Sequence, residues 1–131
     1  MKKLLAGSTG VLFAVLLSLS ATAHHSITMF DREKTITVTG VVKEFQYTNP
    51  HSWLIVTVTD EEGNKANWGF EAEGPSTLIR AGIKKKDFRP GTKITITGNP
   101  IRDGRKAAYW VKAVRLEDGK VFEPRQGFIA R

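Results

Sequence analysis

Three histidines are the residues in this chain best suited to bind a metal ion. His24 and His25 follow the stretch Ala-Thr-Ala directly, and His51 lies in the segment TNPHSW. If a signal peptidase cleaves after Ala23, the free α-amine and the ring Nδ1 of His24 can chelate one metal ion. An α-amine has a pKa of about 7.7–8.0 and an imidazole about 6.5, so a metal can displace both protons near neutral pH. Nitrogen ligands of this kind favour copper(II), and the first candidate cofactor is therefore copper.

The remaining ligands of such a copper site are open. His51 would supply a third nitrogen if its turn lies near the N-terminus, whereas His25 would do so through its ring and the intervening backbone amide. Met29 offers a thioether and Asp31 a carboxylate oxygen, although their spacing demands neither role. The alternative is that the paired histidines are solvated at a chain terminus and that His51 only closes the Asn-Pro turn.

The first 23 residues have the pattern of a secretory signal peptide. Two lysines precede a long uncharged stretch, and Ala21 and Ala23 place small residues at the positions that a signal peptidase reads. We expect cleavage after Ala23 and export to the periplasm or the medium, with an uncleaved membrane anchor as the alternative. Removal of 23 of the 131 residues would leave 108, and loss of two lysines would lower the net charge from +7 to +5. The chain has no cysteine, so a disulfide cannot stabilise it.

Alternating apolar and polar residues predict five strands in the mature chain. In the first strand, Gly40 breaks the alternation, which indicates a bulge or a sharp bend. A short helix follows the third strand, because Pro75 suits a first helical position and Gly82 a left-handed stop. The order β-β-β-α-β-β predicts an all-β fold, a five-stranded OB-like Greek-key barrel with one short helix. The strands are expected near residues 34–47, 53–59, 66–70, 93–98 and 109–116.

Four segments follow from this pattern. They are a signal peptide over residues 1–23, an N-terminal arm over 24–33, a barrel domain over 34–117 and a C-terminal tail over 118–131. We expect the tail to be partly ordered at most.

The mature chain resembles a family of small exported bacterial proteins that share a domain of unknown function. The resemblance rests on the start HHSITMFD, the segment GVVKEFQYTNPHSW, the PSTLIRAG helix, the PGTKITITGNPIRDG hairpin and the closing LEDGK. It covers essentially the whole mature chain, and the His-His-Ser start and the Asn-Pro-His-Ser-Trp turn are its most specific parts. The resemblance implies export and a small β-barrel, and it implies no activity.

The loop between the first two strands is the expected ligand site, because the corresponding loop flanks the binding face of OB barrels. Tyr47, Asn49 and Trp53 would carry contacts to an unknown small molecule or exported protein, although Trp53 fits the core equally well. Export disfavours nucleic acid as a partner. The run Lys84-Lys85-Lys86 is either solvated or attracted weakly to anionic lipid headgroups, at about 1 kcal/mol for each lysine.

Little in the sequence indicates catalysis. Glu71 and Glu73 share a strand face, but two acids at this spacing, which we expect to be exposed, are commonplace. Neither Ser26 nor Ser52, each beside a histidine, has an acidic third member placed by the sequence, and no phosphate-binding loop is present. We therefore lean against an enzyme. The first hypothesis is a binding module, the second is a periplasmic copper-handling protein, and an oxidative copper enzyme is the least supported.

Overall fold

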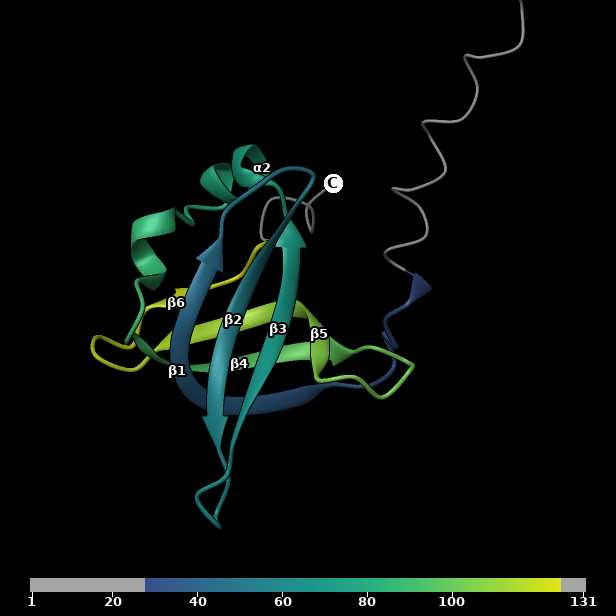
Figure 1. The fold of residues 1–131 in the computed structure, drawn as a ribbon. Coiled ribbons are helices and arrows are strands. Elements are labelled where there is room, and N and C mark those ends of the chain that lie inside the picture. The colour runs from purple at the N-terminus through teal and green to yellow at the C-terminus, as the bar shows by residue number, and fades with distance from the viewer. Residues whose placement is uncertain (1–27, 126–131) are drawn as a thin grey trace, which may run out of the picture.

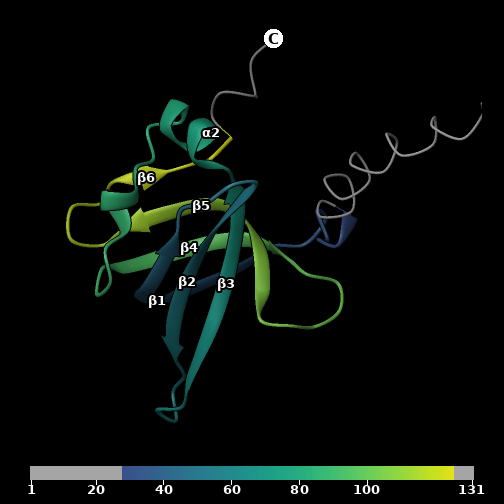
Figure 2. The same cartoon turned by 45° about the horizontal axis from the view of Figure 1, so that its top comes forward.

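The computed structural model describes residues 28–125, so the predicted signal peptide, His24 and His25 lie outside the described part of the chain. Five strands close into a small barrel, and one end of it is covered by two short helices (Figures 1 and 2). This confirms the predicted OB-like fold with one short α-helix. The elements are β1 (Ile36–Gln46), β2 (His51–Thr59), β3 (Lys65–Glu73), α2 (Pro75–Arg80), the 3-10 helix η1 (Lys85–Phe88), β4 (Lys93–Pro100), β5 (Ala107–Arg115) and β6 (Val121–Phe122).

Strand β1 bends so that it serves two parts of the barrel. Its first half pairs with β4, and its second half pairs with β2. The change of partner falls at Gly40 and Val41, and a Cβ atom on Gly40 would collide with the carbonyl oxygen of Thr57. Glycine is therefore required where the backbone of β1 comes close to that of β2. The predicted bend is confirmed, and a separate irregularity in the pairing lies between Val42 and Glu44.

Strands β2 and β3 form a long hairpin with an uninterrupted register from Thr59 opposite Lys65 to His51 opposite Glu73. The Asp60 carboxylate sets the turn, because its Oδ1 accepts hydrogen bonds from the backbone N–H groups of Glu62 and Asn64 at 3.0 and 2.8 Å. These bonds lower the pKa of Asp60. Since a register shift of one residue would turn every side chain to the other face, this turn determines which residues accompany His51.

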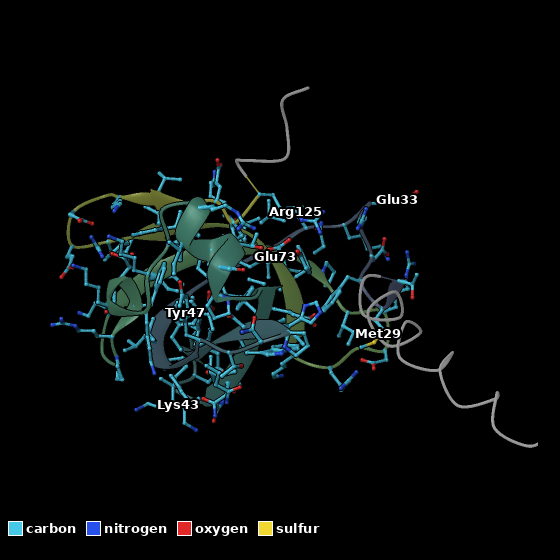
Figure 3. The ribbon with its side chains drawn as sticks, turned by 90° about the horizontal axis from the view of Figure 1, so that it is seen from above. Met29, Glu33, Lys43, Tyr47, Glu73 and Arg125 are labelled. Atoms are coloured by element: carbon cyan, nitrogen blue, oxygen red, sulfur yellow. The ribbon has the colours of Figure 1, made fainter. Side chains whose placement is uncertain are left out.

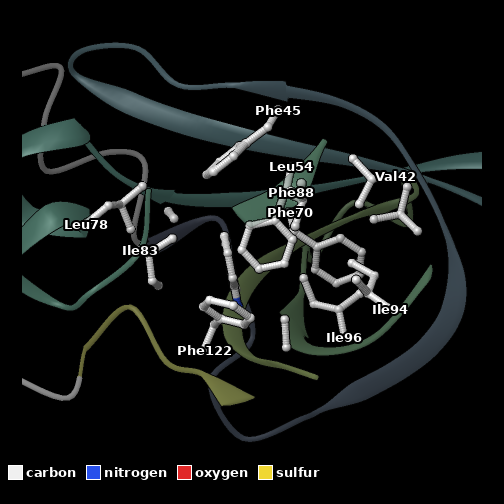
Figure 4. Packing of buried hydrophobic residues seen from close by; sticks show 14 of the residues in the cluster. Val42, Phe45, Leu54, Phe70, Leu78, Ile83, Phe88, Ile94, Ile96 and Phe122 are labelled. Atoms are coloured by element: carbon white, nitrogen blue, oxygen red, sulfur yellow. The ribbon is translucent and has the colours of Figure 1, made fainter. Parts of the chain in front are cut away.

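The barrel interior is filled by aromatic and aliphatic side chains (Figure 4). The ring of Phe88 meets Trp110 edge-on at 5.2 Å and Phe45 at 5.6 Å between centroids, a favourable arrangement of aromatic rings. Trp68 is half-buried and stacks on Phe70 against the same core. Helix α2 contributes Leu78, and β3 and β5 close the barrel as a parallel pair from Gly69 to Glu71.

The C-terminal tail is ordered in its described part, which ends at Arg125. Strand β6 pairs with β5, Phe122 joins the core at 2% exposure, and Pro124 is also buried. A two-residue strand is too short to show an alternating pattern, which is why it was missed. Within the described part of the chain, no helix has the length and apolar character needed to span a bilayer.

Candidate functional site on the outer face of β2, β3 and β5

The outward-facing residues of β2, β3 and β5 form one continuous surface, which we call the outer face. The register places Trp53 opposite Glu71, and the parallel pairing places Glu71 opposite Tyr109. Residues opposite one another in a sheet point to the same side, so all these side chains share it. The outer face consists of His51, Trp53, Ile55, Gly69, Glu71, Glu73, Ala107 and Tyr109.

His51 lies against a buried carboxylate. Its Nδ1 atom is 2.9 Å from Oε1 of Glu71, and only 4% of the Glu71 side chain is exposed, compared with 27% of the His51 side chain. Nδ1 itself is buried and has no hydrogen-bond partner of good geometry, so the contact is a close pairing rather than an aligned hydrogen bond. The other ring nitrogen, Nε2, is the one left for a ligand.

A second polar group lies beside this pair. The Tyr109 hydroxyl donates a short hydrogen bond to Oε1 of Glu73, and Arg125 Nε donates to the same oxygen at 3.0 Å. The Arg125 guanidinium also lies over the Tyr109 ring, 4.7 Å from its centroid. Figure 3 shows Glu73 and Arg125 next to one another. Burial raises the pKa of Tyr109 above its usual range, and the bond to Glu73 raises it further, while Arg125 partly opposes the shift.

One oxygen of this group is unsatisfied. Oε2 of Glu73 is buried and has no hydrogen-bond partner, like Nδ1 of His51 on the residue directly opposite. Buried polar atoms are nearly always hydrogen-bonded, and exceptions call for an explanation such as a bound ion or water. The unsatisfied Glu73 oxygen, on the residue opposite the histidine of the His51–Glu71 pair, therefore marks this end of the outer face as a place where a polar or charged ligand fits.

A small apolar cluster borders the polar groups and holds the N-terminal arm. Phe30 is 2% exposed and meets the Tyr109 ring edge-on at 5.7 Å. Ile101 completes the cluster, and Trp53 packs against it. The arm is also fixed by backbone bonds from Asp31 N to the Pro100 oxygen and from Arg102 N to the Met29 oxygen, both at 2.8 Å. The first described residues thus lie beside the outer face.

The residues predicted to bind an organic ligand lie in different surroundings. Tyr47 is half-buried, and its hydroxyl donates to the backbone oxygen of Ile83 at 2.9 Å. Burial raises its pKa, and the charge of Asp87 adds to this effect. Asn49, exposed and joined to Pro50 by a cis peptide bond, has its side chain close to Gly74. Trp53 alone of the three belongs to the outer face, and a ligand role for them stays a prediction.

The predicted metal ligands within the described part of the chain are His51, Met29 and Asp31. His51 lies on the outer face, whereas Met29 is an exposed residue of the arm, and Figure 3 shows it well away from Tyr47. Asp31 lies 3.5 Å from Lys34 Nζ and 3.8 Å from an Arg102 nitrogen. Among residues 28–125, no group of three or more His, Asp or Glu side chains is arranged to hold a metal ion. A metal at His51 would therefore need donors from outside these residues.

Sequence reasoning missed the buried acids. Glu71 and Glu73 were expected to be exposed, and this was wrong: Glu71 is 3% exposed and Glu73 is half-buried. The strand pattern did place both on one face, but the closing of the barrel by Tyr109 and the contact from Arg125 cover them. One signal of this grouping was available in the sequence. The length of the β2–β3 hairpin already implies that His51 lies opposite Glu73.

These features define a small OB-like β-barrel with a polar, partly buried group on its outer face. The chain belongs to DUF6152, a family of unknown function, which matches residues 13–109. A comparison with curated proteins found no match. The matched residues include His51, Glu71 and Tyr109, and Arg125 lies beyond them.

Proposed function

We propose that the protein is an exported copper-binding protein whose site combines His51 on the outer face with the processed N-terminus at His24. The observation that supports this most is the 2.9 Å contact between His51 Nδ1 and the buried Glu71 carboxylate. Histidines that bind metals commonly present one ring nitrogen to the metal and the other to a carboxylate, which fixes the ring and increases its basicity. His51 has this second partner already in place.

The charges around His51 suit a cation. The neighbouring side chains of β3 include the acids Glu71 and Glu73, and Arg125 neutralises part of this charge. An imidazole with an amine and a second imidazole from His24 would give three nitrogen donors, a set that favours copper(II). This site would serve the carriage or sensing of copper.

The length of the N-terminal arm would allow a processed N-terminus to reach His51. Phe30 packs on Tyr109 of β5, and β3 separates β5 from β2 in the sheet. Neighbouring strands lie about 4.8 Å apart, so β5 and β2 are about 10 Å apart. Phe30 comes six residues after His24, and six extended residues span up to about 20 Å. His25 is the alternative donor, with Met29 as a weak axial ligand.

A ligand-binding module without metal is the second candidate. Trp53 is half-exposed on the outer face and lies across Gly69, with ring carbons 3.2 and 3.3 Å from where a Cβ would stand. An indole held flat beside two polar pairs suits stacking of a small organic molecule or a side chain of an exported protein. Under this candidate Trp53→Ala abolishes ligand binding and leaves metal content unchanged.

The copper proposal is tested by the copper(II) affinity of protein purified from the periplasm, with its N-terminus established by intact mass. The comparison variants are His51→Ala and a chain with one extra residue ahead of His24. We expect both changes to weaken binding at least tenfold, or about 1.4 kcal/mol. If His51→Ala has no effect, and a His-His-Ser peptide binds as tightly as the protein, the proposal is wrong and only generic terminal chelation remains.

A further inference from the structure

The segment from Ile79 to Arg89 carries a dense group of exposed cations. It includes the last two residues of α2, the connection and η1, which lie together at the helical end of the barrel (Figures 1 and 2). Ile79 projects among the charges with 54% of its surface exposed. We call this segment the basic end, and its exposed cations are Arg80, Lys84, Lys85, Lys86 and Arg89.

The basic end is a fixed surface rather than a loose loop. Leu78, Ile83 and Phe88 point into the core and are at most 1% exposed. The Tyr47 hydroxyl also holds the backbone oxygen of Ile83 at 2.9 Å. The chain is therefore fixed to the core just before the segment and at two points within it. The basic side chains between these points face outward at the same end of the barrel.

No exposed acid of the segment offsets its cations. The single acid of the segment, Asp87, accepts a hydrogen bond from the Lys84 backbone N–H at 2.8 Å and lies 3.6 Å from Arg115, with 12% of its side chain exposed. Its charge is therefore turned toward Arg115. Among the ion pairs of residues 28–125, none involves a cation of the basic end.

We propose that the basic end binds the surface of an anionic phospholipid bilayer. A basic residue near such a surface strengthens binding by about fivefold, and several on one rigid surface act together. Ile79 supplies the apolar contact that reaches the boundary between headgroups and acyl chains. Charge complementarity favours this partner. A bilayer presents many anionic groups, and the basic end presents cations with no exposed acid of the same segment between them. The proposal does not depend on copper binding.

The test is sedimentation of the purified protein with vesicles of phosphatidylcholine alone or with about one third phosphatidylglycerol. We expect binding to the anionic vesicles only, and binding that weakens as salt is added, because salt screens exposed charges. Replacement of the three lysines, K84Q with K85Q and K86Q, should weaken binding about a hundredfold at low salt. Ile79→Ser, added to the triple lysine variant, should weaken vesicle binding beyond the triple variant alone in the same assay.

A matched triple variant separates a specific surface from net charge. Lys65, Lys106 and Lys112 are exposed and lie on the hairpin end, the β4–β5 connection and β5. Their replacement by glutamine removes the same charge and should change binding less than twofold. Equal weakening by the two triple variants, or no binding of the unaltered protein to anionic vesicles, would overturn the proposal. Every protein compared has the same N-terminus and is checked for an unchanged melting temperature.

Discussion

The barrel interior and the outer face bury side chains of different kinds. The interior is almost entirely apolar, and Leu54, Phe70 and Trp110 are each at most 1% exposed. On the outer face, one strand residue away, the protein instead buries a carboxylate at 3% exposure beside a histidine. Burial of apolar surface stabilises the fold, whereas burial of a charge costs free energy unless it is paired. The second region is therefore the one that function best explains.

The largest effect on stability is expected from the interior. Leu54→Ala should lower the free energy of unfolding by about 2–5 kcal/mol, because it leaves a cavity in a packed core. Ile55 is the matched control, since it is the next residue on β2, is similar in size and points to the half-exposed outer face. Ile55→Ala should cost about half as much or less. Urea denaturation of both variants checks this, and equal losses would mean that the two faces are packed alike.

The next effect separates function from stability on the outer face. Glu71→Gln removes the charge beside His51 and should weaken copper(II) binding by about 10–100-fold. Its effect on unfolding should be small, because glutamine keeps the size of the side chain and an uncharged amide costs less to bury than a carboxylate. A competition titration with a copper chelator gives the affinity. Unchanged affinity together with a large loss of stability would make Glu71 a purely structural acid.

A smaller effect is expected from the network that holds the tail. Tyr109→Phe removes the hydroxyl that joins Glu73 to Arg125 and should cost about 1–3 kcal/mol. The same variant should change the pH dependence at high pH. The pKa of Tyr109 is raised in the folded protein, so its contribution is complete below the unfolded pKa of about 10 and is lost as the pH rises beyond it.

Urea denaturation across the alkaline range measures this pH effect. The unaltered protein should lose stability more steeply above pH 10 than Tyr109→Phe. Arg125→Met serves as the companion variant, and the two substitutions together should cost less than the sum of their separate effects, since both break the same contacts. Parallel pH profiles for the unaltered protein and Tyr109→Phe would show that the hydroxyl does not change its ionisation on folding.

The fold was predictable because its signals are local. Alternating Ile36 and Val38 with threonines, the break at Gly40, and the Pro75 and Gly82 boundaries of the helix each act within a few residues. The barrel order follows from them. Strand β6 and the 3-10 helix were missed, since two to four residues cannot show a period.

The site was only partly predictable because it depends on contacts between distant segments. His51 and Trp53 were singled out by residue type and by their position after the Asn-Pro turn. The burial of Glu71 and Glu73 depends on Tyr109 and Arg125, which come 36 and 52 residues after Glu73. A pattern within one strand carries no information on what later packs over it. For this reason the acids were expected to be exposed.

The central claim is that His51 on the outer face and the processed N-terminus bind the same copper ion. Pulsed electron paramagnetic resonance of the protein with one equivalent of copper(II) tests it most directly, because it reports how many imidazoles are coordinated. We predict two imidazoles in the unaltered protein and one in His51→Ala, with the fold intact in both. The same number of imidazoles in both proteins would contradict the account, since His51 would then have no place in the copper site.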